Sequence, residues 1–221
     1  MASAGHAGAP TFRDRRDAGR LLASQLSSYA DRTDVVVLGL PRGGVPVAYE
    51  VARSLALPLD ALLVRKLGVP RHEELAFGAI ATGGVRVLNP DVVAETALSS
   101  QEIERIAARQ TLELDRREQL YRQGKPQPEL RGRTAILVDD GLATGATMRA
   151  AVEAVHGQDA RAVVAVPVAP AQTCAQLAAA ADAVVCPLAP EHFVAVGLWY
   201  GEFSPTGDEE VRQLLARAWA R

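Results

Sequence analysis

The chain has 221 residues, with 24 basic and 26 acidic side chains and a formal net charge of −2. This length suits one α/β domain with an elaboration, and the charge gives no general attraction to nucleic acid. No apolar run is long enough to span a membrane, so we expect a cytoplasmic protein without a membrane or nucleic-acid partner. Residues 1–12 are expected to be a flexible tail, because residues 1–10 are rich in Gly and Ala and lack the apolar stretch of a signal peptide.

The first part of the chain alternates predicted helices and strands. Leu21, Leu22 and Leu26 recur at helical spacing, and we expect them to share one buried face. In chain order, we expect an amphipathic helix over residues 14–29, a buried strand over 35–40, a tight loop at 41–44, a helix over 45–57 and a second strand over 61–65.

Residues 67–132 are predicted to form an insertion in this pattern. Residues 79–88 are typical of a hairpin that turns at Gly83 and Gly84. A long charged helix follows over residues 100–122, and Ser99 with Glu102 forms a capping-box pattern at its start. Because charges dominate this helix, two alternatives stay open: it packs on the hairpin, or it packs against a second subunit.

The last part of the chain returns to alternating strands and helices. We expect a strand over residues 161–168, a helix over 171–181, a strand over 183–188 and a surface helix over 208–218 with Leu214 and Leu215 facing inward. Such alternation favours a mostly parallel sheet covered on both faces, and ligands of these sheets bind at the carboxyl ends of the strands. Cys174 and Cys186 stand in apolar surroundings and are expected to be buried free thiols.

Residues 134–147, TAILVDDGLATGAT, carry the most specific pattern in the chain. Four apolar residues suit a fully buried strand, and Asp139 and Asp140 follow at its carboxyl end. Residues 143–147 then offer backbone N–H groups, hydroxyls and a helix N-terminus, which together suit a phosphate. Two acids would repel a bare phosphate, so a ribose 5-phosphate, with hydroxyls for the acids, satisfies both halves. The simpler alternative is a strand–turn–helix in which the acids only cap the helix.

This segment resembles the phosphoribosyl-pyrophosphate (PRPP) motif of type I phosphoribosyltransferases, in which four hydrophobic residues and two acids precede a Thr- and Gly-rich phosphate loop. Two positions depart from it: Gly141 stands where a branched apolar residue is usual, and Ala143 where some purine enzymes carry an aspartate. The resemblance implies a type I phosphoribosyltransferase-like α/β fold in a single domain. That fold would have a mostly parallel sheet flanked by helices, the helical and hairpin insertion, and a C-terminal hood over residues 189–221.

The resemblance also implies a reaction, the transfer of a 5-phosphoribosyl group from PRPP to a nitrogen acceptor, such as a nucleobase in salvage, with release of pyrophosphate. Asp139 and Asp140 would bind the ribose hydroxyls and act on Mg²⁺ indirectly through them, with Lys66 as a further catalytic residue. The 5-phosphate would bind to five loop residues, Ala143, Thr144, Gly145, Ala146 and Thr147. We also expect a homodimer.

Two stretches at strand ends resemble pyrophosphate-binding elements of the family. Arg42, Gly43 and Gly44 offer a charge and close backbone approach to an anion, although in isolation such a sequence is typical of a turn. Arg65 and Lys66 begin a stretch similar to the Arg-Lys-x-Gly-Lys-x-Pro of adenine- and xanthine-type enzymes, without its second lysine. Two cations here suit a leaving pyrophosphate, and the alternative is a solvated strand end.

An aromatic-rich stretch near the C-terminus is the candidate acceptor site. Phe193, Trp199 and Tyr200 loosely resemble the hood of hypoxanthine-guanine enzymes, where an aromatic ring stacks on the base. The alternative, equally open, is a latch that packs the C-terminal segment onto the domain.

The sequence leaves alternatives open for the general base and for whether the protein catalyses a reaction. In the family, residues 70–74 correspond to a mobile loop, in which His72 or Glu74 would take a proton from the attacking nitrogen, although simple solvation of this loop is the favoured interpretation. Because fold does not fix function, three alternatives to the transferase stay open: a non-catalytic regulator that senses PRPP, a nucleotide-binding protein without turnover, and a hydrolase or phosphorylase of nucleotides.

Overall fold

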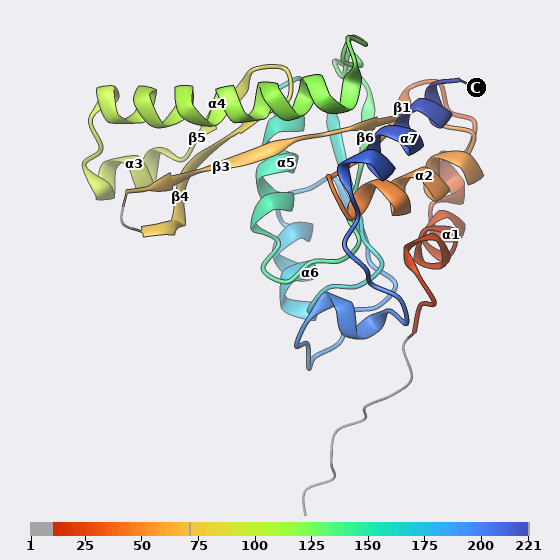
Figure 1. Ribbon diagram of the computed structural model, residues 1–221. Coiled ribbons are helices and arrows are strands. Elements are labelled where there is room, and N and C mark those ends of the chain that lie inside the picture. The colour runs from red at the N-terminus through yellow and green to blue at the C-terminus, as the bar shows by residue number, and fades with distance from the viewer. Residues whose placement is uncertain (1–10, 71, 221) are drawn as a thin grey trace, which may run out of the picture.

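The computed structural model describes residues 11–70 and 72–220, and its centre is a five-stranded parallel sheet (Figure 1). The strands lie in the order β2 (Leu59–Ala61), β1 (Val35–Gly39), β6 (Thr134–Val138), β7 (Arg161–Ala165) and β8 (Ala183–Val185). Gly39 is level with Val138 in the register of β1 and β6. The segments that follow these two strands therefore leave the sheet side by side.

Helices cover both faces of this sheet, because alternate residues of its buried strands point to opposite sides. Val35, Val37 and Ile136 pack on one side, where α1 (Arg15–Gln25), α2 (Gly44–Ser54) and α7 (Asp208–Trp219) lie. The intervening Val36, Leu38 and Leu137 pack on the other side, against α5 (Ala146–His156) and α6 (Ala171–Ala178). The predicted α/β architecture is confirmed.

A second, antiparallel sheet carries the insertion. It consists of β3 (Val64–Val69), β4 (His72–Ala81) and β5 (Val85–Leu88) in that order, followed by α3 (Pro90–Thr96) and α4 (Ser100–Arg122). The predicted hairpin is confirmed, with its turn at Gly83 and Gly84, whose φ angles are +91° and +70°. Glycine suits this turn because it adopts positive φ without steric cost.

Residues 61–65 were expected to form one strand, and this prediction is wrong. Ala61 ends β2 in the parallel sheet, Val64 begins β3 in the other sheet, and Leu62 and Leu63 connect them. Both connecting leucines are buried, so the apolar run that predicted a strand instead packs a crossover between sheets. A loop was also expected at residues 70–74, but residues 72–74 belong to β4, which begins at His72.

α4 has the predicted bounds and the predicted capping box, since the Ser99 side chain accepts from the Glu102 backbone and Glu102 accepts in return from Ser99. The helix contacts β3, β4 and α7, and Figure 1 shows it lying along the small sheet. Ile103 and Leu114 are buried there, and the Tyr121 hydroxyl donates to Asp208 at the start of α7. Of the two alternatives, packing on the hairpin is therefore observed within this chain.

The burial of side chains near the N-terminus corrects two expectations, one about α1 and one about the tail. Leu22 and Leu26 are buried on α1, but Leu21 is 41% exposed, so it does not share their face. The expected tail is shorter than predicted, because Phe12 is buried and its N–H donates to the Trp199 carbonyl at 2.9 Å.

The rest of the chain is close to expectation. Leu214 and Leu215 face inward on α7, as predicted. Cys174 and Cys186 are free but only half-buried, and burial raises the pKa of Cys186 to about 12. Short 3₁₀ turns at Ser27–Tyr29 (η1) and Val196–Trp199 (η2) complete the elements. Within the described part of the chain, no helix combines the length and apolar character that crossing a membrane requires.

A buried ion pair joins the end of α4 to the parallel sheet and generates a stability prediction. Arg122 lies 2.7 Å from the Asp60 carboxylate on β2, and the two side chains are only 4% and 8% exposed. Arg122→Met should lower the free energy of unfolding by about 3–5 kcal/mol, because it leaves the Asp60 carboxylate buried without its partner. Chemical denaturation measures this loss. The matched control is Arg32→Met, which removes an exposed pair with Asp34 and should cost only about 0–1 kcal/mol; equal losses would contradict the prediction.

Candidate active site

Asp139 and Asp140 follow β6 at the carboxyl edge of the parallel sheet, as predicted. Both residues are half-buried, and the Asp140 backbone N–H donates to Asp139 Oδ1 at 2.9 Å. Burial raises the pKa of Asp139 well above its ordinary value, and the neighbouring Asp140 charge raises it further. Burial also raises the pKa of Asp140. The pair is thus a concentrated negative charge that the fold itself disfavours.

Arg15, at the start of α1, is a site residue that the sequence analysis missed. Its Nε donates to Asp140 Oδ2 at 2.8 Å and opposes the rise of the Asp140 pKa. Its Nη1 donates to the Ser204 carbonyl at 2.8 Å, and its guanidinium lies 4.0 Å from the centre of the Phe203 ring. No local motif could have identified Arg15, because 125 residues separate it from Asp140.

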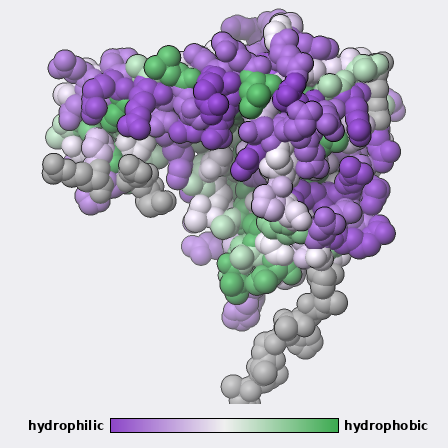
Figure 2. All heavy atoms as spheres, in the orientation of Figure 1, coloured by the Kyte–Doolittle hydropathy of each residue, from purple (hydrophilic) through white to green (hydrophobic). Residues whose placement is uncertain are grey.

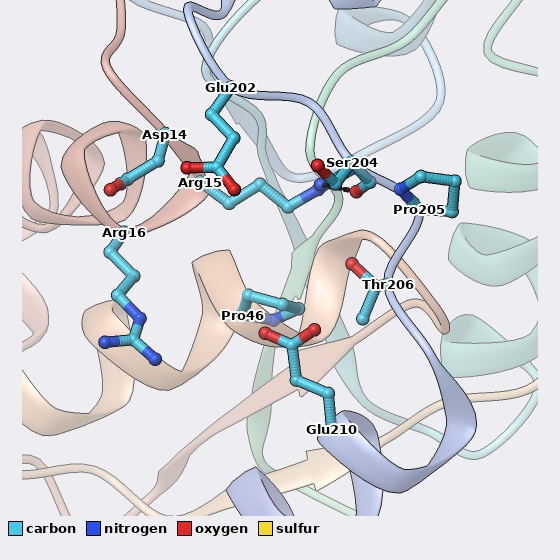
Figure 3. A pocket seen from close by; sticks show the side chains of 9 residues that line it. All are labelled: Asp14, Arg15, Arg16, Pro46, Glu202, Ser204, Pro205, Thr206 and Glu210. Atoms are coloured by element: carbon cyan, nitrogen blue, oxygen red, sulfur yellow. Dashed lines mark hydrogen bonds between the residues drawn. The ribbon is translucent and has the colours of Figure 1, made fainter.

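Arg15 also lines a pocket of about 330 Å³. Figure 3 shows the Arg15 side chain reaching across it towards Ser204, with Glu202 and Glu210 at its edges. No residue predicted for the active site is among those that line this pocket. Asp139 and Asp140 do not line this pocket, and Arg15 reaches Asp140 through the Nε of the same guanidinium.

The loop after β1 packs directly against the acids. A Cβ on Gly43 would collide with the Asp140 carboxylate, and a Cβ on Gly44 would lie 2.5 Å from the Val138 carbonyl. Both glycines are therefore required by close packing of this loop on the end of β6. Arg42 is exposed at the same place, and the peptide bond before it is cis.

The loop after the acids has the geometry of a helix N-terminus. Gly145 is the N-cap of α5 with φ of +68°, and a Cβ there would lie 2.8 Å from the Thr173 side chain. Thr173 Oγ1 donates to the Ala143 carbonyl at 2.8 Å, so the first turn of α6 supports this loop. Thr144 and Thr147 are exposed, which leaves their hydroxyls accessible. Thr173 is a second supporting residue that no sequence pattern indicated.

Gly141 departs from the motif for a reason that the structure supplies. A Cβ at this position would lie 2.5 Å from Val196 Cγ1 and 3.1 Å from Val168 Cγ1. The branched side chain usual at this position would overlap with Val196 of η2. The C-terminal segment thus occupies the space that the glycine leaves.

Arg65 and Lys66 lie on β3, beside Thr147 of the loop at residues 143–147 rather than beside the acids. Together with Thr147 they line a pocket of about 730 Å³ between β3 and α4. A smaller cavity of about 50 Å³ connects Arg65 and Thr147 to Pro41, at the start of the loop after β1. The structure therefore places Arg65 and Pro41, the residue before Arg42, on the wall of one small cavity.

The aromatic stretch mainly packs the C-terminal segment. Tyr200 is buried against Phe12 and Phe203, with ring centres 5.3 and 4.9 Å away, and its hydroxyl donates to the Asp140 carbonyl. Burial and the nearby Asp140 charge raise the Tyr200 pKa. Phe193 and Trp199 stack on each other at 6.5 Å. This arrangement is a latch, and acceptor binding by these rings stays a prediction.

The predicted general base is only partly described. His72 is exposed at the start of β4. The side chain of Glu74 lies outside the described part of the structure, so its role as a base also stays a prediction.

The raised pKa of Asp139 predicts how stability depends on pH. An acid whose pKa is higher in the folded state destabilises the fold increasingly as pH rises from its unfolded pKa, near 3.9, to its folded pKa. Asp139→Asn should therefore stabilise the ligand-free protein at about pH 8 by on the order of 1 kcal/mol, and by less at about pH 4.5. Thermal unfolding of both proteins at the two pH values measures the difference.

The control for that experiment is an acid with the opposite shift. Arg32 lowers the pKa of Asp34 by a side-chain hydrogen bond, so Asp34→Asn should not gain stability as pH rises. A gain for Asp139→Asn that is the same at both pH values would show that titration of this carboxyl is not its cause.

Comparison with known proteins agrees with this geometry. The Phosphoribosyl transferase domain family matches residues 13–198. Two Mycobacterium tuberculosis proteins, from strains CDC 1551 and H37Rv and each named "Putative phosphoribosyl transferase", are 53% identical over 209 residues. These matches cover 94% of this chain but 47% of the relatives, so the chain spans about half of their length.

A solved structure is also similar. The protein TT1426 from Thermus thermophilus is 46% identical, with a TM-score of 0.86 over 93% of this chain and 98% of that one. The two acids, the loop at residues 41–44 and the loop at residues 143–147 gather at the ends of β1 and β6, and the chain belongs to the phosphoribosyl transferase domain family.

Proposed function

We propose that this chain transfers the 5-phosphoribosyl group of PRPP to a nitrogen atom of a small acceptor, a nucleobase in salvage, and releases pyrophosphate. One observation carries the proposal: the acids after β6 lie against the Arg42–Gly44 loop and lead directly into the phosphate loop. A ligand with hydroxyl groups for the acids and an anionic group on each side, one for each loop, would match this arrangement. We further expect the protein to act in the cytoplasm as a homodimer.

Each group would have a distinct task in that reaction. Asp139 and Asp140 would accept hydrogen bonds from the ribose hydroxyls, and Arg15 would hold the Asp140 carboxylate in place from the other side. The loop from Ala143 to Thr147 would hold the 5-phosphate at the N-terminus of α5. Arg42 and Lys66 would stabilise the charge that develops on the leaving pyrophosphate. Such interactions accelerate the reaction only if they strengthen towards the transition state.

The acidic pair also fits the Mg²⁺ that the family implies. Within residues 11–70 and 72–220, no group of three or more His, Cys, Asp or Glu side chains could hold a metal ion. Mg²⁺ needs no such cage, because it keeps several waters and binds through one or two carboxylates and the phosphates of a substrate. Asp139 and Asp140 would orient the hydroxyls towards the ion, which would neutralise part of the pyrophosphate charge.

Isotope exchange tests turnover directly. Labelled pyrophosphate should enter PRPP when the wild-type protein is incubated with Mg²⁺ and a panel of nucleobases and their nucleotides. Asp139→Asn with Asp140→Asn should abolish both exchange and PRPP binding by calorimetry, while circular dichroism shows an intact fold. PRPP binding by the wild type without exchange for any acceptor would instead indicate a protein that only senses PRPP, and unchanged PRPP affinity in the double variant would overturn the site assignment.

The two anion sites should fail for different ligands. Thr147→Val deletes one hydroxyl donor and should weaken PRPP and a nucleoside 5′-monophosphate, by ~1.5–3 kcal/mol for a hydrogen bond to a charged group. Arg42→Ala should weaken PRPP and pyrophosphate but spare the monophosphate, which has no group at that end. Dissociation constants for the three ligands measure the pattern. If both variants weaken the same ligands equally, the division into a phosphate loop and a pyrophosphate loop is wrong.

Gly44 is a poor position for that test. A Cβ there would meet the Val138 carbonyl, so a larger residue would disturb the end of β6 as well as any ligand.

A further inference from the structure

The long helix α4 supplies cations to the pocket that lies beside the phosphate loop. This pocket measures about 730 Å³, and its wall combines β3 with one face of α4. Arg65 and Lys66 come from β3, and Arg105 and Arg109 come from α4. Residues four apart on a helix share a face, which places both arginines over the same space. Figure 2 shows the hydrophilic surface that runs along this helix.

Arg105 and Arg109 differ from the other arginines of α4 in their partners. Arg116 and Arg117 both pair with Glu113, and Arg122 pairs with Asp60 and Glu118. Arg105 and Arg109 are both exposed, and neither forms an ion pair with any residue that the structure describes. Carboxylates therefore form ion pairs with the arginines of the second half of α4, but not with the two arginines at the pocket.

Glu102, which lies three residues before Arg105 on α4, is already engaged. Glu102 acts on Arg105 only through its charge, because its Oε2 accepts from the Ser99 hydroxyl at 2.7 Å and from the Ser99 N–H at 3.1 Å. On the facing strand, Arg65 Nε donates to Gln110 Oε1 at 2.6 Å, a neutral partner. Within the described structure, no hydrogen bond to a carboxylate therefore neutralises the positive charge of Arg65 or Arg105 at the pocket.

The lining of the pocket suits an anion rather than a flat neutral base. Among its described residues there is no Asp, no Glu and no aromatic side chain. Cations around a concave site raise the local concentration of anions and bind them through charge-assisted hydrogen bonds. Thr147 of α5 also lines the pocket, so a ligand held here would be a neighbour of the PRPP 5-phosphate.

We propose that this pocket is an anion site additional to the PRPP phosphate sites, and that it binds a phosphate or carboxylate group of the second substrate through Arg105 and Arg109. The identity of that ligand as the acceptor rests on the proposed transferase function, whereas the anion site itself does not. The proposal gives Arg105 and Arg109 a role in binding, which the packing of α4 on the small sheet does not explain. It also separates acceptor binding from the aromatic latch, whose Tyr200 is occupied with Asp140.

The test uses inorganic phosphate as the probe and saturating PRPP with Mg²⁺ to block the other sites. Equilibrium dialysis with labelled phosphate, at fixed ionic strength, should show one phosphate bound per wild-type chain in the presence of PRPP. Arg105→Gln with Arg109→Gln should weaken this binding by about tenfold or more, the loss expected for two hydrogen bonds to a charged group. Arg116→Gln changes the same charge on the same helix outside the pocket, and its affinity should stay within about twofold.

A second readout locates the anion and distinguishes the two proposals. In crystals grown with tungstate and without PRPP, anomalous density should lie beside Arg105 and Arg109 in the wild type and be absent in the Arg105/Arg109 variant. Density that persists in that variant would indicate an adventitious ion only, and complete competition between PRPP and phosphate would show that the pocket is merely the pyrophosphate site; either result overturns the proposal. If the wild type fails to bind PRPP, the transferase function fails, while the tungstate density still decides the anion site.

Discussion

Two adjacent carboxylates at the end of a buried strand are the constraint around which this site is arranged. Asp139 and Asp140 are held where burial disfavours their charge, so the fold must oppose their repulsion. Arg15 does this from the side, by a 2.8 Å contact with Asp140. The loop at Gly43 and Gly44 comes close to the acids because neither residue carries a side chain. Buried carboxylates with raised pKa values are typical of functional sites, where the cost in stability is retained because the groups are needed to bind a ligand.

Both ends of the described chain converge on the same pair. Near the N-terminus, Arg15 binds the Asp140 carboxylate, and Phe12 pairs with Tyr200. From the C-terminal segment, Tyr200 donates to the Asp140 carbonyl, while Val196 fills the space above Gly141. The C-terminal segment is therefore not an independent cover. It is packed onto the motif itself, and a change in either segment would reach the acids through one contact.

The insertion adds a wall that the parallel sheet alone would lack. α4 is anchored at its end by the buried pair of Arg122 and Asp60, and at Tyr121 by Asp208. This anchoring fixes the helix relative to the sheet, so Arg105 and Arg109 are presented to a defined space beside Thr147. Because cations on a rigid element lose less freedom on binding than cations on a loop, α4 is a suitable carrier for a binding surface.

The sequence by itself determined the features whose physical cause is local. The apolar run and acids of residues 134–140, the glycine turn at residues 83–84 and the capping box at Ser99 each depend on neighbouring residues, and each was predicted where it is found. Residues 61–65 show where this reasoning stops, because an apolar run fits a buried crossover between two sheets as well as it fits a strand. Only the tertiary structure decided that Arg15 reaches Asp140, that Thr173 supports the loop at Ala143, and that α4 faces β3 across a cationic pocket. These contacts join residues that are far apart in the chain, and their partners are selected by the path of the backbone through space, which no periodicity of the sequence records.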